Sequence, residues 1–86
     1  MTLLAAAAAL DALASGLEPK RGDVISGALV LQTLVRRGEG DRDVQDAALG
    51  LEAVATGRPL DLDQAGRARA AELARKVREL SATINT

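Results

Sequence analysis

Glycine and proline divide this 86-residue chain into four short segments. The breaks contain Gly16 and Pro19, then Gly38 and Gly40, then Gly57 and Pro59. Between the breaks, apolar residues recur at intervals of three and four, which is the period of an α-helix. A glycine after the last periodic residue, followed by a proline, is typical of a helix end. We therefore predict an all-α protein with one helical domain over residues 1–86. In it, a small antiparallel bundle is formed by four helical segments at about 2–16, 23–37, 41–56 and 61–83.

Several polar residues stand where these helices should begin. Thr2 and Asp23 are predicted N-caps, and carboxylates crowd the start of the third segment. Asp61 is the predicted N-cap of the fourth segment, where Gln64 completes a capping box. Gly66 then lies inside this helix, where glycine is unfavourable, and two explanations stay open: a close crossing with a neighbouring helix or a functional loop.

Two segments carry apolar residues beyond the single face that a helix packs against a core. The second segment is apolar around most of its circumference, which is typical of a central helix or of an oligomer interface. The fourth segment carries a heptad seam formed by Ala70, Leu73, Val77, Leu80 and Ile84. On its outer face, Glu72 and Arg75 should pair with Lys76 and Glu79 one turn later. We identify no internal repeat. The predicted partner interface comprises Leu73, Val77, Leu80 and Ile84, followed by Leu29 and Val30.

The apolar residues include no Phe, Tyr or Trp. Aromatic side chains normally supply the largest contacts in a core, so a core made of alanine and leucine gains less from burial. Small domains with a thin core often gain stability by oligomerisation. This composition therefore favours a homo-oligomer.

The chain also lacks the residues that most chemistry requires. It has no Cys and no His, which excludes thiolate catalysis, zinc–sulfur sites and a histidine general base. No serine stands in a nucleophile motif, and we predict no catalytic residue, no metal ligand and no cofactor. We therefore expect a non-enzymatic protein–protein interaction module: an adaptor, a small chaperone-like subunit or a homo-oligomeric assembly component.

Two other functions remain open as alternatives. The basic residues Arg67, Arg75 and Arg78 could contact phosphates if the third and fourth segments formed a helix-turn-helix, although the formal charge of −1 makes nucleic acid an unlikely partner. Residues 61–72 are spelled like a degenerate EF-hand calcium loop, but Ala65 replaces one of its oxygen ligands.

The tripeptide 21–23, Arg-Gly-Asp, matches an integrin-recognition motif, but we interpret it as a turn in which the aspartate caps the second helix. The apolar stretch 3–10 lacks the positive region that precedes a signal sequence and is too short to span a membrane. We therefore expect a cytoplasmic protein that binds no membrane, and no small-molecule ligand is evident. The abundance of alanine, arginine and glycine indicates a bacterial or phage gene.

Overall fold

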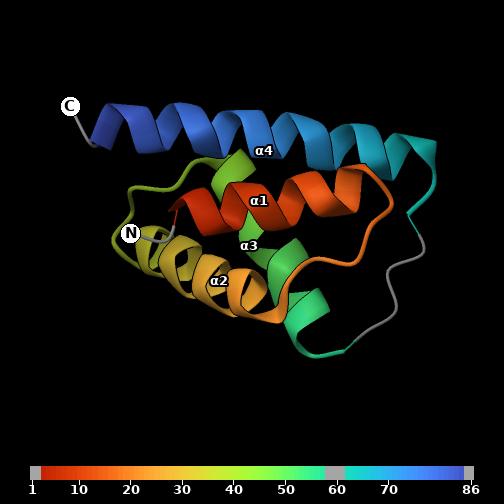
Figure 1. Cartoon of the computed structure of the whole chain (residues 1–86). Coiled ribbons are helices and arrows are strands. Elements are labelled where there is room, and N and C mark those ends of the chain that lie inside the picture. Colours follow the sequence, from red (N-terminus) through yellow and green to blue (C-terminus); the bar gives the residue numbers. More distant parts are fainter. Residues whose placement is uncertain (1–2, 58–61, 85–86) are drawn as a thin grey trace.

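The computed structural model describes residues 3–57 and 62–84 and contains four α-helices and no strand within those ranges (Figure 1). The helices are α1 (Leu3–Ala14), α2 (Arg21–Arg36), α3 (Arg42–Ala55) and α4 (Gln64–Ile84). Helices α1 and α4 run side by side in opposite directions, and α2 packs against α3 (Figure 1). The predicted all-α bundle is confirmed.

The three glycines predicted to end helices do so. Gly16, Gly38 and Gly57 have φ angles of 74°, 73° and 79°, in the left-handed region that glycine adopts without strain. At the end of α1, the amide of Leu17 donates to the carbonyl of Ala12, and the amide of Gly16 donates to the carbonyl of Leu13. This pair of hydrogen bonds is the Schellman arrangement, and it satisfies carbonyls that the helix itself leaves free.

The helix beginnings differ in part from the prediction. Asp41 caps α3, since its side chain accepts a hydrogen bond from the amide of Val44 at 3.0 Å. Helix α2 begins two residues before Asp23, because Arg21 and Gly22 are helical, so the prediction that Asp23 is the N-cap is wrong. Asp23 lies instead in the first turn, where its charge still favours the helix dipole. The Arg-Gly-Asp tripeptide is therefore the first turn of α2 and not a loop.

Helix α4, in contrast to α2, begins later than predicted. Its first helical residue is Gln64, and the preceding Asp63 accepts a hydrogen bond from the amide of Gly66 at 2.8 Å. Asp63 is therefore the capping residue in place of Asp61, which lies outside the described residues, as does Thr2. The cap moves because a side chain must stand one residue before the helix to reach its free amides.

The core is built from small and branched aliphatic side chains contributed by all four helices. Leu3, Leu31 and Leu51 are the largest fully buried side chains. Helix α1 packs against each of the other three, whereas among the described residues the Cα atoms of α2 and α4 stay more than 8 Å apart. The central helix is therefore α1 and not α2. The alanine-rich sequence of α1 explains this position, because small side chains let several helices approach the same axis.

Helices α1, α2 and α3 share a pattern that the sequence analysis missed. Position 1 of this pattern is aliphatic, position 4 is glycine or alanine, and position 5 is alanine. Position 8 is leucine, and position 11 is again aliphatic. These residues are Leu3, Ala6, Ala7, Leu10 and Leu13 in α1; Val24, Gly27, Ala28, Leu31 and Leu34 in α2; and Val44, Ala47, Ala48, Leu51 and Val54 in α3. The first four are buried in every helix, and the fifth is buried or half-buried. The interpretation that the chain has no internal repeat is therefore wrong.

A close helix crossing lies at Gly27 and not at Gly66. A β-carbon added to Gly27 would lie 2.6 Å from the Cα atom and 2.9 Å from the Cβ atom of Ala6, so α1 and α2 meet here almost backbone to backbone. The atoms nearest to a β-carbon on Gly66 would be those of Leu62 and Asp63, its own sequence neighbours, at 3.1 Å or more. Of the two explanations left open for Gly66, the structure does not support a close helix crossing.

Candidate functional site

The heptad seam of α4 faces the inside of the chain. Leu73 and Val77 are buried in the core and Leu80 is half-buried against it, while the side chain of Ile84 lies outside what the structure describes. In this single chain Leu73 and Val77 are therefore inaccessible to a partner. Of the other two residues predicted for an interface, Val30 is half-buried and Leu29 is 61% exposed.

A charged cluster joins the start of α3 to the middle of α4. Asp43 is its centre, and its carboxylate accepts hydrogen bonds from Lys76 at 2.6 Å and from Arg69 at 2.9 Å. Arg69 also reaches Asp46 at 2.8 Å and Glu72 at 3.2 Å. The expected pairing of Lys76 with Glu72 is thus replaced by a contact between helices, whereas Arg75 pairs with Glu79 as predicted. The cluster links α3 to α4 through charged side chains.

The electrostatics of this cluster favour the charged forms of Asp43, Lys76 and Arg69. Hydrogen bonds from Lys76 and Arg69 lower the pKa of the Asp43 carboxyl below its usual value. The bond to Asp43 raises the pKa of Lys76, and bonds to Asp46 and Asp43 raise that of Arg69. A general base needs a raised carboxyl pKa and a nucleophilic lysine needs a lowered amine pKa. Both shifts run the opposite way, so the arrangement suits a structural link better than proton transfer.

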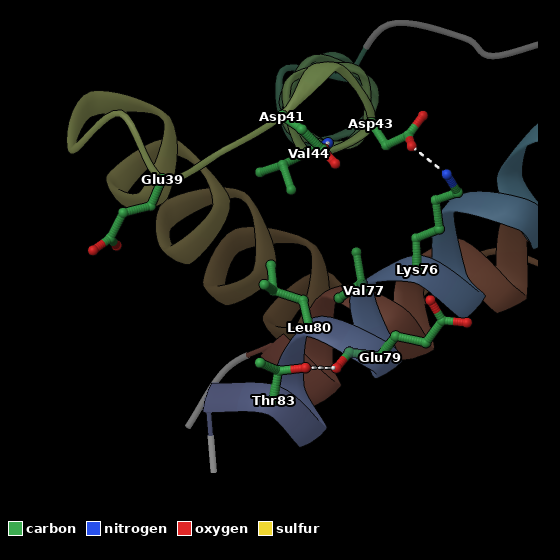
Figure 2. Close-up of a pocket in the computed structure, with 9 residues that line it drawn as sticks. All are labelled: Glu39, Asp41, Asp43, Val44, Lys76, Val77, Glu79, Leu80 and Thr83. Atoms are coloured by element: carbon green, nitrogen blue, oxygen red, sulfur yellow. Dashed lines mark hydrogen bonds and ion pairs between the residues drawn. The ribbon is translucent and has the colours of Figure 1, made fainter. Parts of the chain in front are cut away.

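A pocket of about 260 Å³ opens beside this cluster, between the start of α3 and the last turns of α4 (Figure 2). Its inner wall is aliphatic and consists of Val44, Val77 and Leu80, with the Lys76–Asp43 pair at one edge. Figure 2 shows the carboxylate of Glu39, on the opposite rim, directed away from the other lining residues. The acidic groups therefore do not converge on one point inside the pocket.

The basic residues proposed for nucleic acid lie in three different settings. The guanidinium of Arg67 lies against Gly16 at the end of α1, Arg78 pairs with Asp11 of α1, and Arg75 pairs with Glu79. Helix α4 also packs along α1, and eight residues separate α3 from α4, whereas a helix-turn-helix needs a turn of about three to four residues. For the calcium loop, Asp61 lies outside the described residues, and the described part holds no group of three carboxylates placed to bind a metal.

The largest exposed apolar residues of α2 and α3 lie on the outer side of this helix pair. Ile25, Leu29 and Leu49 are 41%, 61% and 65% exposed. Ile25 and Leu29 stand on one face of α2 together with Gln32 and Arg36, since the intervals are four, three and four residues. By the same spacing, Gln45, Leu49 and Glu52 share one face of α3. We call these seven residues the hairpin face.

A groove of about 420 Å³ runs between the two helices of the hairpin face. Val35 and Ala48 line it together with five members of that face: Gln32, Arg36, Gln45, Leu49 and Glu52. The sequence analysis included Leu29 but missed Leu49. The signal was present in the repeat, because Leu29 and Leu49 both follow the buried alanine of their own helix.

Comparison of the chain with family models, with curated proteins and with solved structures finds no significant match. Within the described residues, every helix is too short or too polar to cross a bilayer.

Proposed function

We propose that this protein is a protein–protein interaction module that binds through the hairpin face. The observation that carries the proposal is the exposure of Leu29 and Leu49 on the hairpin face. Leu49 lines the groove, and Leu29 stands on the same face of α2 as the lining residue Gln32, with Ile25 one turn away. Single exposed leucines are normal on protein surfaces, but several beside one groove are typical of a binding surface. The two leucines flank polar side chains that can fix the orientation of a partner.

Two further observations support an interaction role. The charged forms of Asp43, Lys76 and Arg69 are favoured, and the acidic side chains that line the pocket beside them do not converge on one point, so neither feature suggests a reaction. Leu29 and Leu49 are not members of the hydrophobic core.

Photocrosslinking in the cells that make the protein tests this proposal. A p-benzoylphenylalanine in place of Gln45 would sit in the groove, and one in place of Arg42, whose side chain is 88% exposed, serves as the control on the same helix. We expect position 45 to give one dominant protein adduct that position 42 does not give. Equal labelling at both positions, or none at either, would refute the proposal.

A further inference from the structure

We propose that the partner on the hairpin face is a second copy of this chain, bound across a two-fold axis. This inference rests on the proposed function and names the occupant of the same surface. A two-fold contact uses the same patch on both copies, so the patch must be complementary to itself. The hairpin face meets this requirement in its charges, its apolar residues and its size.

The charges on the two walls of the groove are opposite. Arg36 stands on the α2 wall and Glu52 on the α3 wall, and among the described residues neither forms an ion pair within the chain. A two-fold axis that brings Arg36 of one copy to Glu52 of the other necessarily forms the same pair a second time. Such rim charges select the partner and its orientation more than they add affinity.

Each helix of the hairpin face carries one exposed leucine at the same position of the repeat. Leu29 and Leu49 occupy equivalent positions of the internal repeat, 20 residues apart, on two helices that pack against each other. Each helix of the face therefore offers a leucine of similar exposure, 61% and 65%, to a matching face. A two-fold contact between two such faces can bring the four leucines of the two copies into one apolar centre.

The size of the face sets the expected strength. Helices of 16 and 14 residues present about 20 Å by 20 Å of surface, at about 1.5 Å per residue and about 10 Å per helix width. A contact between two such faces lies near the lower limit of about 1,000 Å² for a specific interface. We therefore expect a dimer that dissociates in the micromolar range.

Sedimentation equilibrium of the full chain between about 5 and 500 μM tests the proposal. We expect a concentration-dependent dimer, and we expect Arg36→Glu and Glu52→Arg each to weaken it more than about tenfold, because each change places like charges together twice. Arg75→Glu on α4 is the control and should leave dimerisation unchanged. All three positions are exposed, and circular dichroism should show unchanged helix content.

Mixing the two charge variants gives the decisive measurement. Arg36→Glu carries two acidic groups on its face and Glu52→Arg carries two basic groups, so an equimolar mixture should restore a dimer made of one copy of each. A wild-type chain that stays monomeric at about 500 μM would overturn the second copy as partner. So would a mixture that stays monomeric. The proposed function is judged separately: an adduct at position 45 with a different protein would retain it, and the absence of any adduct would remove it.

Discussion

The close crossing at Gly27 predicts that adding one methyl group there will destabilise the protein. Elsewhere in a helix, replacing glycine by alanine stabilises it by about 1 kcal/mol. At Gly27 the new β-carbon would lie 2.6 Å from the Cα atom of Ala6, about 1 Å closer than a normal carbon–carbon contact. Both sides of the contact are helix backbone, so α1 and α2 must move apart. Overpacking of this kind costs typically 1–3 kcal/mol, and we expect about 3 here.

Offsetting this cost by the gain in helix propensity leaves a net loss of about 2 kcal/mol for Gly27→Ala. A chain of this length has a total stability of about 4–13 kcal/mol, so the loss is a large fraction of it. The melting temperature should fall by about 8–16 °C. Thermal and urea unfolding followed by circular dichroism measure both quantities, and the urea m-value should stay constant if only the native state is strained.

Gly50→Ala is the matched control. Gly50 is also inside a helix, but a β-carbon there would meet nothing within 4 Å. This variant should therefore gain about 1 kcal/mol and melt about 4–8 °C higher than the wild type. If Gly27→Ala were stabilised as much as Gly50→Ala, the backbone-to-backbone crossing of α1 and α2 would be refuted.

Three further predictions concern the charged cluster, a helix cap and the core. Asp43 has a lowered pKa in the folded state, so it stabilises the protein above its unfolded pKa of about 3.9, and this contribution is lost as the pH falls through the folded value. Asp43→Asn should therefore be less stable at pH 7 and should converge with the wild type in acid unfolding curves below about pH 4. Asp63→Ala should lose about 1 kcal/mol in urea unfolding through its cap, whereas Asp23→Ala, which removes no cap bond, should lose less. Leu51→Ala should lose about 2–5 kcal/mol, because Leu51 is fully buried, whereas Leu49→Ala should change monomer stability by less than about 0.5 kcal/mol.

Local signals in the sequence predict the elements of this fold well. Gly16, Gly38 and Gly57 end their helices as expected. The left-handed backbone conformation at a helix end favours glycine, so this signal is local and can be read from the sequence. The N-termini are predicted less well, since several neighbouring polar residues can cap a helix. In α4 both Asp61 and Asp63 qualify by type, and the choice depends on where the chain leaves the preceding connection.

Tertiary contacts are harder to predict, because an apolar face on a helix does not identify the neighbouring helix that packs against it. Gly66 and Gly27 are both glycines inside helices. The sequence alone does not distinguish a glycine that contacts the backbone of another helix from one that contacts its own sequence neighbours. The seam of α4 is a real apolar stripe, but α1 covers it, so Leu73 and Val77 become core residues. The central position of α1 follows from its many alanines. Alanine contributes little to a hydrophobicity pattern, so the sequence does not identify α1 as the central helix.

The internal repeat adds an argument about the hairpin face that neither helix supplies alone. The residue after the buried alanine is exposed in all three helices, and it is Ala8 in α1 but Leu29 in α2 and Leu49 in α3. Since the same position is exposed each time, packing within the chain does not require a leucine there, and alanine is the better helix former. Exposed leucines lower solubility without adding to the core. Leucine at two of the three equivalent positions, on the two helices that border one groove, therefore supports a role for these side chains outside the single chain.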